Sequence, residues 1–169
     1  PKFNGRRLDD IVDFLSFVFL PCVAFGLLEL FPLNLKWFAL VPIMASAYGF
    51  CQERAKTEDA FVGFPSYWNV VLFYLYVFRL DPWSNICIVG FLSVMVFVPI
   101  KWVYPSRTAR FRGVTLVASA LWGASCIAML VQYPIVAPWL LPASLLLLVC
   151  SLFVEGIAAT SMRFPGVGP

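Results

Sequence analysis

The stretch LDDIVDFLSFVFLPCVAFGLLELF, residues 8–31, decides the fold of this chain. Three aspartates lie in its first six residues, and no further charged residue follows until Glu29. A helix of about 20 mostly apolar residues is long enough to cross the hydrocarbon core of a bilayer. The stretch therefore predicts a membrane-spanning helix that carries its acids at one end.

Five further apolar runs follow, so the sequence predicts an all-α bundle of transmembrane helices. Apolar residues make up 62% of the 169 positions and charged residues 12%, which is about half the charge of a water-soluble domain. The third run is short; it either extends back through residues 61–65 or enters the membrane by a kinked segment there. A single transmembrane domain over residues 1–169 is expected, with six spans at residues 8–31, 35–51, 66–78, 83–100, 114–131 and 135–157.

The placement of Lys and Arg predicts the orientation of these spans. With the N-terminus in the cytoplasm, ten basic residues lie on the cytoplasmic side and two, Lys36 and Arg79, lie outside, as the positive-inside rule requires. Loops 52–64 and 101–113 then face the cytoplasm, and the cluster Arg107, Arg110 and Arg112 is interpreted as topology-setting.

Charge and cysteine usage exclude some function classes. A net charge of +3 is too small to indicate binding to nucleic acid, and the chain has no histidine. Its five cysteines are scattered singly through the apolar regions, a pattern that predicts neither a disulfide framework nor a zinc site.

The carboxylates of the first span are the candidate functional residues. Positions four apart point about 40° from one another on a helix, so Asp9 and Asp13 share a face with Gly5, whereas Asp10 is turned about 100° away. Helix capping explains Asp9 and Asp10, but its stabilisation fades after the first turn, where Asp13 enters the apolar zone. A carboxylate pair on one face supplies half of a site for a hard divalent cation.

The spacing Gly5-x3-Asp9-x3-Asp13 resembles the second half of the signature of CDP-alcohol phosphatidyltransferases, D-x2-D-G-x2-A-R-x8-G-x3-D-x3-D. The chain is similar throughout to the bacterial phosphatidylcholine synthases of this family, most densely over residues 5–80. Its most specific part is GFPSYWNVV at residues 63–71, beside LDDIVDFL (8–15), ASAY (45–48), Gln52 and AKT (55–57). The first half of the signature is absent, so the resemblance implies two further helices upstream and eight spans in the complete protein.

The resemblance implies attack of the choline hydroxyl on the β-phosphorus of CDP-diacylglycerol, giving phosphatidylcholine and CMP. Asp9 matches a metal-binding aspartate, and Asp13 matches the aspartate that acts as general base and also touches the metal, Mn²⁺ or Mg²⁺. Such ions neutralise the charge of a pyrophosphate, and a positioned base makes an alcohol nucleophilic. Gly5 and Lys56 are the candidates for nucleotide or phosphate binding.

The headgroup site is predicted around the start of the third span. A quaternary ammonium cannot donate hydrogen bonds, and proteins hold it by cation–π contacts with aromatic rings. Aromatic residues at a span end are also common at the membrane interface, so an ordinary structural role is the alternative. The candidates are the rings of Tyr67, Trp68 and Tyr74, an acid from the preceding loop (Glu53 or Asp59), and the polar side chains of Gln52 and Asn69.

Other functions stay open at this stage. Relatives with the same signature use serine, inositol or glycerol phosphate as the alcohol. A transporter subunit would bind its ion at Asp9 and Asp13, and a scaffold would need neither acid for chemistry. We expect a multi-pass protein of the bacterial inner membrane whose site faces the cytoplasm, with membrane lipids and a second copy of the chain as partners.

Overall fold

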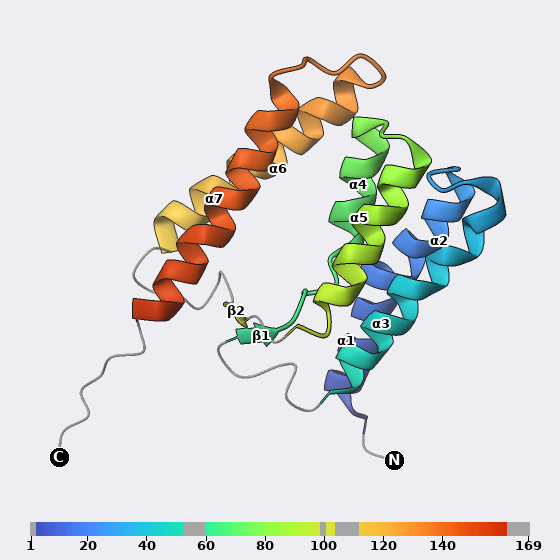
Figure 1. The fold of residues 1–169 in the computed structure, drawn as a ribbon. Coiled ribbons are helices and arrows are strands. Elements are labelled where there is room, and N and C mark those ends of the chain that lie inside the picture. Colours follow the sequence, from blue (N-terminus) through green and yellow to red (C-terminus); the bar gives the residue numbers. More distant parts are fainter. Residues whose placement is uncertain (1–2, 53–59, 99–100, 104–111, 162–169) are drawn as a thin grey trace. The chain divides into compact units, whose positions relative to one another are not determined.

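The computed structural model describes residues 3–52, 60–98, 101–103 and 112–161. Within these residues the fold is helical apart from two strands of three residues (Figure 1). The chain divides into two compact units, residues 1–57 with 61–101, and residues 58–60 with 102–169. The contacts thus group the chain into two units, and a single transmembrane domain stays a prediction.

The first predicted span is one continuous helical rod in three parts. It consists of α1 (Gly5–Asp13), a π-helical segment η1 (Phe14–Phe19) and α2 (Leu20–Leu27). The rod ends four residues earlier than predicted, because Glu29 adopts the left-handed conformation with φ 55° and turns the chain. The Glu29 carboxylate lies 3.4 Å from the Lys36 ammonium, which belongs to the following segment.

The next three predicted spans also form helices. A 3₁₀ segment, η2 (Leu33–Ala39), is kinked at Leu35 and continues into α3 (Leu40–Cys51). The third span is α4 (Trp68–Phe78), preceded by a non-helical Gly63–Ser66 stretch, so the helix does not extend back through residues 61–65. A kinked entry into the membrane stays a prediction. The fourth is α5 (Pro82–Met95), which ends five residues before the predicted boundary.

The strands were not predicted from the sequence. β1 (Ala60–Val62) and β2 (Lys101–Val103) pair with one another. They come from the two predicted cytoplasmic loops, and the division between the two units falls within them.

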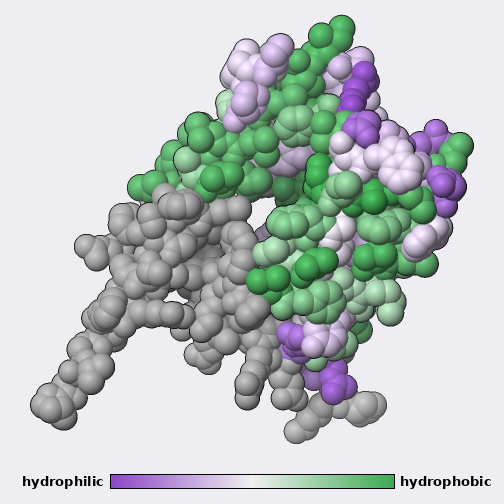
Figure 2. All heavy atoms as spheres, in the orientation of Figure 1, coloured by the Kyte–Doolittle hydropathy of each residue, from purple (hydrophilic) through white to green (hydrophobic). Residues whose placement is uncertain are grey.

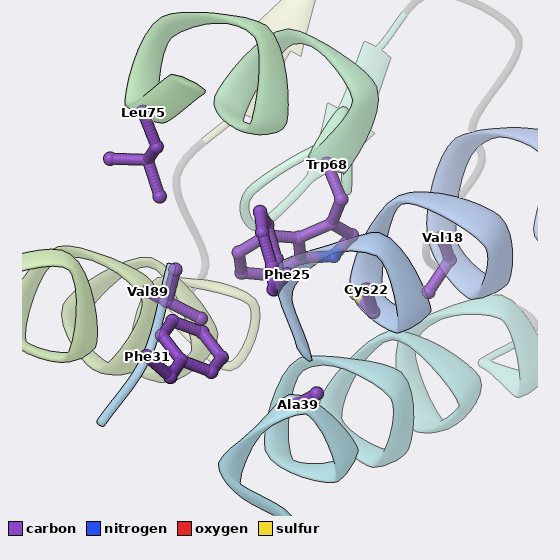
Figure 3. Packing of buried hydrophobic residues seen from close by; sticks show 8 residues of the cluster. All are labelled: Val18, Cys22, Phe25, Phe31, Ala39, Trp68, Leu75 and Val89. Atoms are coloured by element: carbon purple, nitrogen blue, oxygen red, sulfur yellow. The ribbon is translucent and has the colours of Figure 1, made fainter. Parts of the chain in front are cut away.

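One apolar cluster holds the first unit together (Figure 3). The rod contributes Val18, Cys22 and Phe25, and Trp68 of α4 lies fully buried against the ring of Phe25. Leu75, Val89, Phe31 and Ala39 complete the cluster from α4, α5, the turn after the rod and η2. The core therefore begins about one helical turn beyond Asp13.

A buried amide joins α5 to the turn after the rod. Asn85 Nδ2 donates to the carbonyl oxygen of Leu30 at 2.9 Å, at the end of the unit opposite to the aspartates. The N-terminus of α5 is capped by Asp81, whose carboxylate accepts hydrogen bonds from the backbone N–H groups of Trp83 and Ser84 at 3.1 Å.

The second unit is a helix pair, α6 (Arg112–Gln132) and α7 (Leu140–Ser161), which covers the last two predicted spans. Buried Met129 of α6 meets buried Ser144 of α7, whose hydroxyl lies 3.9 Å from the Met129 sulfur. The turn between them is held by Gln132 Oε1, which accepts from the Ala137 N–H at 3.0 Å.

Six helical segments thus stand at the six predicted positions in the described residues. By length and composition, one of them is long and apolar enough to cross a membrane, the rod over residues Gly5–Leu27. Shorter apolar helical stretches lie at Trp68–Phe78, Pro82–Met95, Leu116–Gln132 and Leu140–Cys150 in the described part of the chain.

Candidate active site

The acid-bearing helix α1 is capped by Asn4 and not by its aspartates. Asn4 Oδ1 accepts a hydrogen bond from the backbone N–H of Arg7 at 3.2 Å, and Gly5 is the first helical residue. Asp9 and Asp13 come one and two turns later, beyond the first turn in which capping and the helix dipole act. Capping was the alternative explanation for Asp9, and it is wrong.

The two acids differ in exposure. Asp9 is exposed, whereas Asp13 and Asp10 are half-buried on the side of α1 that faces the rest of the unit. Asp13 therefore stands at the border between the packed side of the helix and its open side, and Asp9 lies one turn nearer the polar end. Carboxylate oxygens are the ligands that hard divalent cations prefer, so the pair fits as part of a cation site.

Aromatic contacts place Asp13 beside two other helices. The ring of Phe14 meets that of Phe50 near the end of α3 with centroids 5.5 Å apart. The ring of Phe17, four residues after Asp13, meets that of Tyr67 just before α4 with centroids 6.2 Å apart. The acids, the end of α3 and the start of α4 therefore lie at one end of the first unit.

The GFPSYWN segment reaches this end through a tight turn. Gly63 has φ +89°, and a Cβ at this position would lie 2.2 Å from the carbonyl oxygen of Val96. The N–H of Phe64 donates to the carbonyl of Met95 at 3.0 Å, and buried Ser66 is also left-handed, with φ 57°. The segment is thus docked on the end of α5 before Tyr67 begins the approach to α4.

The three predicted cage aromatics lie in different surroundings. Tyr67 is 40% exposed, whereas Trp68 is 0% and Tyr74 is 7% exposed. The Trp68 indole donates to the Ser46 hydroxyl at 2.7 Å, and the Tyr74 ring packs on those of Phe73 and Phe78. Tyr67 is thus the ring of the three that a ligand can reach, and headgroup binding stays a prediction.

Two of the remaining candidates, Gln52 and Asn69, lie at the same end of the first unit. Gln52 is exposed and ends α3. Asn69 lies in the first turn of α4, and its Oδ1 is buried without a hydrogen-bond partner among the described residues. Lys56 and Asp59, together with Glu53, lie outside the described residues. The described part of the chain contains no group of three or more His, Cys, Asp or Glu that could hold a metal ion.

Several residues that position the candidate site were not predicted from the sequence. Ser46 lies 22 residues before its partner Trp68, and only its polarity within an apolar run marks it. Phe17 and Phe50 had no signal at all, because aromatic residues are 17% of the chain and their contacts are long-range.

Curated proteins of bacteria match this chain over most of its length. A phosphatidylcholine synthase of Legionella pneumophila is 42% identical over 146 residues, which are 79% of this chain and 56% of that protein. One of Legionella bozemanae is 38% identical over 79% of this chain and 66% of its own. One of Pseudomonas aeruginosa is 34% identical over 83% and 60%. No family model matches the chain, and no solved structure does.

Fold and site together define a helical protein with a carboxylate pair at the polar end of a membrane-length apolar helix. Within that class, the chain belongs to the family of the bacterial phosphatidylcholine synthases. It spans 56% to 66% of the length of these three relatives. The resemblance in the sequence is thereby confirmed.

Proposed function

We propose that this chain carries the catalytic base and part of the cation site of an enzyme that makes phosphatidylcholine from CDP-diacylglycerol and choline. The observation that carries the proposal is Asp13. It is half-buried on a helix, next to Phe14, whose ring meets Phe50, and one turn before Phe17, whose ring meets Tyr67. The chain matches relatives named phosphatidylcholine synthase. The name of these relatives gives the product, and Asp13 supplies the base that the proposed reaction requires.

In the proposed reaction the choline oxygen forms a bond to the β-phosphorus, and the bond from that phosphorus to the CMP oxygen breaks. Asp13 accepts the proton of the choline hydroxyl, because an alcohol is a poor nucleophile until a positioned base removes its proton. Asp9 and Asp13 would hold Mn²⁺ or Mg²⁺, which supplies charge neutralisation for the pyrophosphate when bound. These two carboxylates would fill part of a coordination shell.

Recognition of choline is assigned to the open end of the unit. Tyr67 offers an accessible ring for a cation–π contact, held against Phe17 one turn from Asp13. Trp68 follows Tyr67 directly and helps to fix its position, because the Trp68 indole donates a hydrogen bond to the buried Ser46 hydroxyl. Gln52 and Asn69 are the polar candidates around the headgroup, and Gly5 and Lys56 are those for the nucleotide phosphates.

We place the protein in the bacterial inner membrane as a multi-pass bundle with this site on the cytoplasmic side. In Figure 2 apolar residues dominate the middle of the first unit, and hydrophilic residues gather toward its two ends. The distribution of ten basic residues against two supports the orientation. A homodimer stays a prediction.

The test is product formation by the complete protein in liposomes with CDP-diacylglycerol, Mn²⁺ and radiolabelled choline, serine, inositol or glycerol 3-phosphate. Labelled lipid is expected with choline. Asp13→Asn should lower the rate by about 10²–10⁴, the contribution of a general base. Asp10→Asn is the matched control on the same helix and should retain the rate within about tenfold.

Each competing function has its own outcome. Product with serine alone would replace choline and keep the reaction type. A transporter subunit would give no product with any alcohol. A scaffold would leave Asp13→Asn without effect on its function, which would overturn the proposed role of the acid.

A further inference from the structure

The rod that carries the acids changes its helical register immediately after Asp13. Residues Phe14–Phe19 form a π-helical segment between two α-helices, and the N–H of Leu20 donates to the carbonyl of Leu15, five residues back. Such a segment holds one residue more than an α-helix does over the same stretch. π-Helical segments are rare, and they are frequently found at functional sites.

Pro21 explains why the shift falls here. Proline has no N–H and its ring clashes with the carbonyl four residues back, which is that of Phe17, within the π segment. The Ser16 hydroxyl donates to the Val12 carbonyl at 2.7 Å and so helps to satisfy the backbone where the ladder changes. The local sequence therefore favours the altered register over a continuous α-helix.

The burial pattern shows what the shift does. Up to Phe17, the side of the rod that faces the unit consists of Asp10, Asp13, Phe14 and Phe17, all half-buried. From Val18 onward, that side consists of Val18, Pro21, Cys22 and Phe25, all buried. On an uninterrupted α-helix, at about 100° per residue, the centres of these two stripes would lie about 80° apart.

One extra residue absorbs about 100° of rotation, which nearly cancels this offset and brings both stripes to the same neighbours. With the core stripe held in place, a straight α-helix would turn Asp13 by about 100° away from Phe50 and Tyr67. The contacts of Phe14 and Phe17 with these two rings require the shifted register.

We propose that the π-helical segment is a positioning element, which aims Asp9 and Asp13 at the substrate side of the unit. The role in catalysis rests on the proposed function, but the effect on register does not. Neither Leu15 nor Ser16 is assigned contact with substrate, since both side chains are exposed. The element acts through the direction that it gives to the acids.

The test compares two deletions in the complete protein, that of Leu15 alone and that of Leu15 together with Ser16. Deletion of Leu15 alone removes the extra residue, so a continuous α-helix should form that keeps both stripes on the same side of the rod. Deletion of both residues should rotate α1 by about 100° against the core, which carries a side-chain tip about 8 Å. Activity should stay within about tenfold of the parent in the single deletion and fall at least a hundredfold in the double deletion.

Register is read separately by spin-label distances, in a background without the native cysteines. One label is placed on α3 at Met44, and the other on α1 at Ile11 or at Val12; all three side chains are exposed. Ile11 and Val12 point about 100° apart, so a rotation must change at least one of the two distances by several ångströms. The double deletion should show this change, and the single deletion should change neither distance by several ångströms.

Changed distances in the single deletion would overturn the proposal, and so would unchanged distances or retained activity in the double deletion. If a deletion variant does not fold, labels placed singly along residues 8–25 of the intact chain decide. Their accessibility to oxygen should follow the α-helical period with a phase step of about 80° after Asp13, and an unbroken period would overturn the proposal. Full activity of Asp13→Asn would overturn the proposed function while leaving the distance result intact.

Discussion

Substitution of Gly63 by alanine should destabilise the first unit strongly. The new Cβ would lie 2.2 Å from the carbonyl oxygen of Val96, which is backbone and cannot turn aside like a side chain. Holding a non-glycine residue at φ +89° costs about 1–3 kcal/mol, and relief of an overpacked contact costs about 1–3 kcal/mol more. We therefore expect a loss of about 2–6 kcal/mol in the free energy of unfolding.

The assay is unfolding of the purified protein by SDS in mixed micelles, followed by tryptophan fluorescence. Gly123→Ala is the matched control, since a Cβ at that position in α6 meets nothing within 4 Å. Alanine in a helix interior is favoured over glycine by about 0.5–1 kcal/mol, so this control should be neutral or slightly stabilising. A Gly63→Ala protein within 0.5 kcal/mol of the parent, a margin typical of harmless surface changes, would refute the docking of this turn on α5.

Four further results are expected. Trp68→Phe leaves the buried Ser46 hydroxyl without its donor, so unfolding free energy should fall by about 1–3 kcal/mol, and a double-mutant cycle with Ser46→Ala should show coupling. Tyr67→Leu should raise the KM for choline about tenfold with kcat little changed, whereas Tyr67→Phe keeps the ring and the KM, as a cation–π contact predicts. Hydrogen bonds from the side chain and backbone of Ser84 lower the pKa of Asp81 in the folded protein. The stability that ionised Asp81 contributes is therefore complete above its pKa in the unfolded chain, and it is lost as the pH falls through its pKa in the folded protein. Asp81→Asn should reduce this loss of stability at acid pH, measured by SDS unfolding. Chelation with EDTA should abolish product formation, and Mn²⁺ or Mg²⁺ should restore it; unchanged activity would argue against the cation site.

Much of the fold could be predicted because the forces behind it are local. Each long apolar run must satisfy its own backbone hydrogen bonds, and a helix does so within the run, so all six segments appeared where expected. The ends were less accurate, as at Leu27 and Met95. A left-handed residue such as Glu29 ends the rod, and no composition signal marks it.

The site was predicted in part, for the same reason. The shared face of Asp9 and Asp13 follows from helical spacing alone. Residue type could not separate Tyr67 from Trp68, because both suit an interface, a cage or a core. Their roles depend on Ser46 and Phe17, and neither partner is a neighbour in the sequence.

The direction in which Asp13 points depends on more than spacing. Asp9 and Asp13 keep their relation to each other on any helix, but the core begins only at Val18, beyond the π-helical segment. One residue in the wrong register would leave the acid pair intact and turn it away from Tyr67. A motif that is correct in sequence is therefore insufficient, because the backbone between Asp13 and Pro21 determines which side of the unit Asp13 faces.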